Sequence, residues 1–142
     1  HITNDGLITC KCDVLIPAAL ENQITEDNAG RIQAKLIIEA ANGPTSVEAD
    51  EILNSRGIIV CPDILSNAGG VATSALEMSQ NSQRLSWTSE EVDAKLHQIM
   101  VDIYAKISDA AKRYDMPDNF VVGANIAGFE KVVDAMMAQG IV

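Results

Sequence analysis

The chain has few basic residues and no long apolar run. Its 142 residues include 10 lysines and arginines against 20 aspartates and glutamates, a formal net charge of −10. Nucleic-acid binding depends on clustered cations, and these cations are spread along the chain, so we expect no nucleic-acid partner. No apolar run approaches the length of a membrane span, and the N-terminus has no charged-then-apolar signal region. A hydrophobic content of 47% excludes a disordered tail.

Cysteine is also scarce. The three cysteines, Cys10, Cys12 and Cys61, are an odd number without paired spacing. Cys10 and Cys12 resemble half of a metal site, but no second cysteine or histidine cluster completes a tetrahedral set. We therefore expect no metal site, and we expect free thiols of the kind found in a reducing cytoplasm.

The residues that usually carry catalysis form no recognisable set. The chain has no Ser-His-Asp or Cys-His arrangement and no G-x-G-x-x-G phosphate loop. His97 falls within an amphipathic helical pattern, and we interpret it as a surface residue. Asp63 follows an apolar run, and its simplest role is that of a turn or capping carboxylate. We expect no catalytic residue in this chain.

Three nearly continuous apolar runs, at 12–17, 34–40 and 58–64, predict parallel strands that are covered on both faces. With helices between them, they predict a parallel sheet with right-handed crossovers. The predicted fold class is α/β: the second half of a Rossmann-like, doubly wound sheet (βαβαβ, about 12–65), followed by C-terminal helices (70–142). No linker or repeat divides the chain, so we expect a single unit.

Capping signals mark where these helices begin. Thr25 precedes acidic residues, and Thr45 with Glu48 has the spacing of a capping box. Thr88 and Glu91 form a second capping box, which opens a long helix with an apolar stripe. The stripe consists of Val92, Leu96, Ile99, Ile103, Ile107 and Ala110. A last helix is predicted to end at Gly140.

The segment 66–74 carries the strongest functional signal. We interpret it as the end of a strand, a glycine-rich turn and the start of a helix, and ligands of open α/β sheets bind at such strand ends. Asn67 offers amide donors and an acceptor. Gly69 and Gly70 allow close approach of backbone to ligand, and the helix N-terminus favours an anion. The segment therefore predicts a site for a polar, anionic small molecule.

The two other strand ends are expected to border the same crevice. Asn42 ends the second run, and sheet order places it beside Asn67. Ala18 and Ala19 end the first run, and their small side chains leave room for a flat ring or a ribose. Simpler interpretations remain open at this point: Asn67 as a helix cap, Asn42 as a turn residue, and Ser74 as a helical serine bonded to its own backbone.

Four segments, at 12–19, 39–45, 66–81 and 123–129, resemble in order the glutamate dehydrogenases of the Glu/Leu/Phe/Val dehydrogenase family. The resemblance covers about 12–142 and corresponds to the C-terminal part of the nucleotide-binding domain. It implies an oxidoreductase that interconverts L-glutamate with 2-oxoglutarate and ammonium, using NAD or NADP.

The resemblance also implies roles for particular residues. In the family, the positions of Ala18, Ala19, Asn42 and Asn67 line the cofactor crevice. Asn67, Val71 and Ser74 match positions at the substrate. The serine, with a lysine from another domain, holds the side-chain carboxylate of the substrate, whereas branched-chain and phenylalanine dehydrogenases have an apolar residue there. Ser74 therefore favours a dicarboxylate.

The family's phosphate loop, catalytic lysine and catalytic aspartate lie upstream of the matched region. By resemblance we expect an inactive portion of a larger, hexameric enzyme. Coenzyme choice stays open, because 12–45 looks more like NAD-using members and 66–142 more like NADP-using members. Two alternatives also stay open: a branched-chain or phenylalanine dehydrogenase fragment, and a non-catalytic α/β assembly domain.

Overall fold

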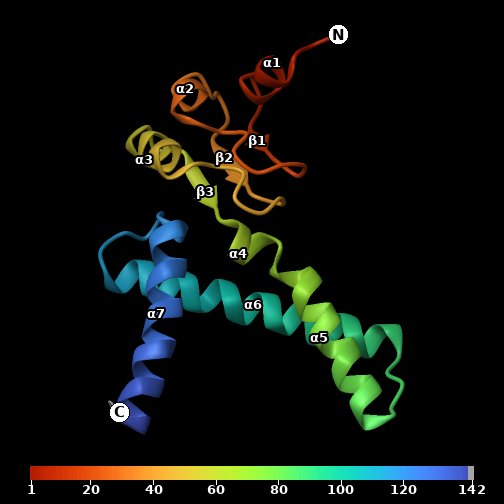
Figure 1. Cartoon of the computed structure of the whole chain (residues 1–142). Helices are drawn as coiled ribbons and strands as arrows, with labels where there is room; N and C mark the ends of the chain where they lie inside the picture. The colour runs from red at the N-terminus through yellow and green to blue at the C-terminus, as the bar shows by residue number, and fades with distance from the viewer. Residues whose placement is uncertain (141–142) are drawn as a thin grey trace.

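A computed structural model describes residues 1–140 of the chain. Its sheet contains β1 (Val14–Leu15), β2 (Leu36–Ile38) and β3 (Ile59–Cys61), in that spatial order and all parallel. Figure 1 shows the sheet with short helices at one end of the molecule and three longer helices below it. The predicted βαβαβ order and α/β class are confirmed, although each strand is shorter than its apolar run.

Short helices pack around this sheet: α1 (Asn4–Ile8), α2 (Glu26–Ala29) and α3 (Val47–Ser55). The sequence analysis did not identify α1. The core of this part is aliphatic, and its fully buried side chains come from the loops, β2 and α3. The largest of them are Ile24, Ile32, Ile37, Pro44 and Leu53.

The start of α3 differs from the prediction by one residue. Ser46 is the N-cap, and its Oγ accepts a hydrogen bond from Ala49 N at 3.2 Å. The predicted Thr45–Glu48 capping box is therefore wrong. Thr45 is held in a parallel bridge with Ile24, and this extended pairing leaves the next residue to begin the helix.

The end of the third strand also differs from the prediction. The strand stops at Cys61, and the short helix α4 (Asp63–Ser66) follows before α5 (Ala68–Gln83) begins. The Pro62 carbonyl accepts hydrogen bonds from the N–H groups of Leu65 and Ser66, both at 2.9 Å, which turns the chain into a helix. Asn67 therefore lies at the α4–α5 junction rather than directly at a strand end, and the two glycines lie in α5 rather than in a turn.

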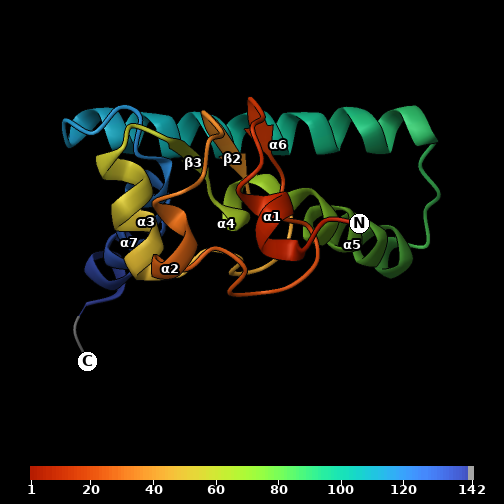
Figure 2. The same ribbon diagram turned by 90° about the horizontal axis from the view of Figure 1, so that it is seen from above.

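The two longest helices, α6 (Ser89–Arg113) and α7 (Phe120–Gln139), cross beneath the sheet. The Thr88–Glu91 capping box is confirmed, with bonds of 2.8 and 3.2 Å. Ile107 and Ala110 of the predicted stripe are buried, and the rest of it is half-buried. Figure 2 shows α6 along the width of the molecule, with α5 toward one end and α7 toward the other.

Gly123 lies where α7 crosses α6. A β-carbon there would stand 2.5 Å from the Ile107 carbonyl oxygen and 3.0 Å from Ala111 Cβ. The crossing therefore requires a glycine. Neither helix, nor any other within residues 1–140, combines the length and apolar character that a bilayer crossing needs.

Candidate functional site

A cavity of about 540 Å³ opens between the loops that follow β1 and β2 and the first turns of α5. It is lined by Ala19, Glu21, Ala40, Ala41, Asn42, Asn67, Gly70, Val71 and Ser74. These residues come from three separate stretches of the chain, which the parallel topology brings to one edge of the sheet. Every predicted site residue except Ala18 contributes to the lining.

Asn42 and Asn67 meet in this cavity. Asn67 Nδ2 donates a hydrogen bond to Asn42 Oδ1 at 2.6 Å. Asn67 is the N-cap residue of α5 by position, as the simpler interpretation has it, but its side chain makes no capping bond to the helix. The pairing uses one donor and one acceptor, and it leaves Asn67 Oδ1 and Asn42 Nδ2 for a ligand.

Backbone bonds hold the loops around this pair. The Pro17 carbonyl accepts from Ala40 N at 3.1 Å and from Ala41 N at 2.9 Å. Gly43 has a φ of +55°, a conformation that glycine adopts without strain. Its N–H donates to Asp63 Oδ2 at 2.8 Å, which ties the Asn42 loop to α4. Ala18 is exposed and lies outside the lining.

The α5 side of the cavity is built from one helical face. Gly70, Val71 and Ser74 all line it. Ser74 Oγ donates to the Gly70 carbonyl at 3.3 Å, a long bond that a ligand acceptor can replace. A β-carbon at Gly70 would have no other atom within 4 Å, so this position leaves space for a ligand. At Gly69 the β-carbon would be 3.6 Å from Met100 Sδ, which shows that this glycine faces α6 instead.

Sequence reasoning missed Glu39, just after β2. It is only 7% exposed, and its Oε2 accepts a hydrogen bond from Asp63 N at 3.0 Å. Burial raises the pKa of this carboxyl, while the Thr45 hydroxyl and the Asp63 N–H oppose the shift. Thr45 Oγ1 lies near it without making a hydrogen bond of normal geometry. The signal was available, because Glu39 is an acidic residue that directly follows the apolar residues Leu36, Ile37 and Ile38.

The cavity contains no arrangement for nucleophilic or acid–base catalysis. Asp63 is engaged with Gly43 N, and His97 is an exposed residue of α6. Glu21, also missed by the sequence analysis, is the carboxylate in the lining. Within residues 1–140, no cluster of histidine, cysteine and acidic residues is suited to a metal ion. The site can hold and orient a ligand through amides, a hydroxyl and small side chains.

The chain matches the family model of the glutamate/leucine/phenylalanine/valine dehydrogenases over residues 1–140. The chain belongs to this family. The resemblance stated from the sequence segments is thereby confirmed.

Relatives within this family include enzymes of both coenzyme types. The NAD-specific glutamate dehydrogenase of Clostridium symbiosum is 51% identical over 135 residues, which are 92% of this chain and 30% of that protein. The NADP-specific glutamate dehydrogenase of Haemophilus influenzae is 49% identical over 137 residues, covering 91% of this chain and 30% of that protein. The chain thus spans about 30% of the length of these relatives.

Solved structures of the family show the same fold. A glutamate dehydrogenase with 49% identity superposes with a TM-score of 0.87, covering 94% of this chain and 31% of that one. A hetero-hexameric glutamate dehydrogenase from Thermus thermophilus superposes with a TM-score of 0.91 at 27% identity, over 99% of this chain and 33% of that one. The sheet, its crossovers and the C-terminal helices are therefore those of glutamate dehydrogenase structures.

Proposed function

We propose that the chain is part of a longer NAD(P)-dependent glutamate dehydrogenase and forms the nicotinamide side of its active site. The observation that carries the proposal is the single cavity in which Asn42, Asn67, Val71 and Ser74 meet. The relatives named as NAD- and NADP-specific glutamate dehydrogenases support the same assignment.

The coenzyme would lie against the paired amides. Asn42 and Asn67 keep one donor and one acceptor between them, which matches the carboxamide of a nicotinamide ring. Ala19 and Gly70 contribute little bulk to the lining, which suits a flat ring and its ribose. We assign Ala18 to the same crevice by family resemblance only.

The substrate would lie along α5. Val71 supplies an apolar wall, Ser74 supplies a hydroxyl, and Asn67 stands where the coenzyme and substrate parts of the cavity meet. A hydroxyl can donate to a carboxylate, and a hydrogen bond to a charged group contributes about 1.5–3 kcal/mol. Ser74 therefore favours a dicarboxylate, 2-oxoglutarate or glutamate, over an apolar amino acid.

The reaction would interconvert glutamate, water and the oxidised coenzyme with 2-oxoglutarate, ammonium, a proton and the reduced coenzyme. When bound, the nicotinamide accepts or returns the hydride. The residues described here position the two reactants, and such positioning is a large part of catalysis. The groups that move protons would come from the rest of the protein.

The test is an assay of the full-length protein with 2-oxoglutarate and ammonium, using NADH and NADPH in turn. Ser74→Val is expected to lower kcat/KM for 2-oxoglutarate by more than about tenfold, as the loss of a hydrogen bond to a charged group would. Thr73→Val is the matched control, because Thr73 also bonds to the helix backbone, at 2.9 Å, but does not line the cavity.

The outcomes separate the proposal from its alternatives. Faster oxidation of leucine than of glutamate by the full-length protein would identify it as a dehydrogenase of apolar amino acids. An unchanged kcat/KM in Ser74→Val would make that residue structural. Turnover of 2-oxoglutarate by this chain alone would contradict the absence of catalytic groups from it. Comparison of the rates with NADH and NADPH identifies the coenzyme, because the residues of this cavity do not distinguish between the two.

We further propose that the full-length protein is a homo-oligomer of the cytoplasm. The Thermus thermophilus relative, a hetero-hexamer, supports assembly into an oligomer, and the unpaired thiols Cys10, Cys12 and Cys61 support a reducing compartment. Size-exclusion chromatography with light scattering gives the subunit number.

A further inference from the structure

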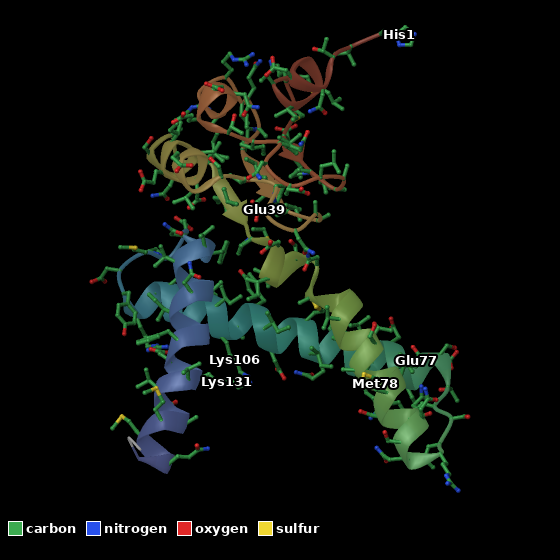
Figure 3. All side chains as sticks on the ribbon, in the orientation of Figure 1. His1, Glu39, Glu77, Met78, Lys106 and Lys131 are labelled. Atoms are coloured by element: carbon green, nitrogen blue, oxygen red, sulfur yellow. The ribbon has the colours of Figure 1, made fainter. Side chains whose placement is uncertain are left out.

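Glu39 is a buried residue whose hydrogen bonds reach α4, the helix that precedes Asn67. It directly follows β2 and is only 7% exposed. Figure 3 shows it between the sheet and α4. A buried carboxylate costs stability unless hydrogen bonds compensate for its lost hydration. Burial and the nearby carboxylates of Asp63 and Asp50 all raise its pKa. A carboxyl group in such an unfavourable environment suggests a role in positioning the residues around it.

The hydrogen bonds of Glu39 join β2 to α4. Its Oε2 accepts from Asp63 N, at the start of α4, at 3.0 Å. Its backbone carbonyl accepts from Ser66 Oγ, at the end of α4, at 2.6 Å. Both ends of this one-turn helix are therefore attached to a single residue, and Asn67 is the next residue after the helix.

Asp63 extends the same network to the Asn42 loop. While its N–H is held by Glu39, its Oδ2 accepts from Gly43 N at 2.8 Å. Asn42 thus precedes one anchored residue and Asn67 follows another. The 2.6 Å hydrogen bond between the two asparagine side chains then links the Asn42 loop directly to the end of α4.

We propose that Glu39 is a positioning residue, which sets Asn42 and Asn67 at the spacing that the nicotinamide end of the coenzyme requires. This inference rests on the proposed function and goes beyond it, because Glu39 does not line the cavity of about 540 Å³. Its carboxylate acts through Asp63 and the α4 backbone. An apolar residue in its place would leave the Asp63 N–H without its acceptor, and α4 would be held to residue 39 only at its far end, through the bond from Ser66 Oγ to the backbone carbonyl.

The test uses the full-length protein and measures coenzyme binding by titration of NADH and NADPH fluorescence. Glu39→Ala removes the acceptor and is expected to raise the coenzyme Kd by about tenfold or more. Glu39→Gln keeps an acceptor of the same length and is expected to restore the Kd to within about threefold of the wild-type value. Glu39→Asp keeps the charge but shortens the reach, and is expected to behave like Glu39→Ala.

Glu51→Gln is the control, because it removes the same charge from an exposed residue of α3 that takes no part in the hydrogen bonds joining Glu39, Asp63 and Gly43. Its Kd is expected to equal that of the wild type. Thermal unfolding verifies that each variant is folded at the titration temperature. If Glu39→Ala does not fold, the coenzyme Kd of Glu39→Asp is compared with that of Glu39→Gln, and a higher Kd for Glu39→Asp supports the inference in the same way.

A purely structural role predicts that Glu39→Ala and Glu39→Asp lower the melting temperature and leave the coenzyme Kd unchanged while folded. That result would overturn the inference. Failure of the proposed function can be told apart from failure of the inference about Glu39, because it would appear as a wild-type protein that does not turn over 2-oxoglutarate. Wild-type turnover together with an unchanged Kd in the variants would reject the role of Glu39 alone.

Discussion

The sheet part and the helical part of this molecule are held together in different ways. Around the sheet, large aliphatic side chains such as Ile37 and Leu53 are fully buried within a continuous core. The helices below it share a smaller cluster of Leu65, Ile107 and Ala124, and α5 buries none of its residues. The sheet part contains its own stabilising contacts, whereas α5 and the far end of α7 leave apolar side chains in solvent.

This difference bears on how the candidate site is assembled. Asn42 lies on a loop anchored to the well-packed sheet, whereas Val71 and Ser74 lie on the helix with no buried residue. Val71 is 75% exposed and Met78 is 70% exposed. Such exposed apolar helix faces usually mark contact surfaces. The α5 side of the cavity therefore depends on further contacts more than the Asn42 side does.

The largest expected effect comes from truncating the core of the sheet part. Leu53→Ala should cost about 2–5 kcal/mol of unfolding free energy, because the Leu53 side chain is completely buried. Met78→Ala should cost less than about 0.5 kcal/mol, as for an exposed residue. Amide exchange at Ile37 reports the sheet part, and fluorescence of Trp87, the only tryptophan, reports the α5–α6 connection. Equal changes in both signals on Leu53→Ala would mean that the two parts unfold as one unit.

The second effect concerns the helix crossing. Gly123→Ala places a methyl group 2.5 Å from the Ile107 carbonyl oxygen, so α6 and α7 must separate. We expect a loss of about 1–3 kcal/mol, as for other overpacked contacts. Gly128→Ala is the matched control on the same helix, because nothing lies within 4 Å of the added group. It should stabilise the protein by up to about 1 kcal/mol through helix propensity.

Urea unfolding followed by far-UV circular dichroism measures both glycine variants. Equal stability of the two would show that the α6–α7 crossing adjusts without cost.

The smallest effect concerns Glu39, at the boundary between the two parts. Burial raises its folded-state pKa above the ordinary value. The folded chain therefore holds this proton more tightly than the unfolded chain, and the stability gained from it is lost as pH rises through the folded pKa. Glu39→Gln should thus be more stable than the wild type at neutral pH, and the advantage should shrink as pH falls toward about 4.

Melting temperatures of Glu39→Gln and the wild type across pH 4 to 8 measure this difference. Glu51→Gln, on the exposed surface, is expected to show no such trend. A stabilisation that does not vary with pH would assign the effect of Glu39→Gln to something other than ionisation.

Features with a periodic or positional signal could be predicted from the sequence. The three apolar runs gave the parallel sheet, and the stripe from Val92 to Ala110 gave α6. The meeting of Asn42 and Asn67 followed from topology alone, since both follow neighbouring parallel strands. These predictions rest on local pattern and sheet order, which do not need knowledge of distant contacts.

The features that the sequence analysis missed depend on contacts between residues far apart in the chain. The helix α4 is too short for a periodic pattern, and it is held at both ends by Glu39, which precedes its first residue by 24 positions. Ser46 replaces Thr45 as a cap because Thr45 pairs with Ile24. No local rule gives either result.

The glycine crossing of α6 and α7 also bears on the accuracy of the site. The Leu96 and Met100 side chains of α6 are near Gly69 in the first turn of α5, and these two residues are about 10–17 Å along the helix axis from Ile107 at the crossing. A rotation of α6 by about 5° at the crossing would displace that point by about 1 Å, and an error of that size can cost about 100-fold in rate. The position of Ser74 in the cavity is thus a matter of mechanical stiffness, set by how closely the backbones of α6 and α7 approach each other.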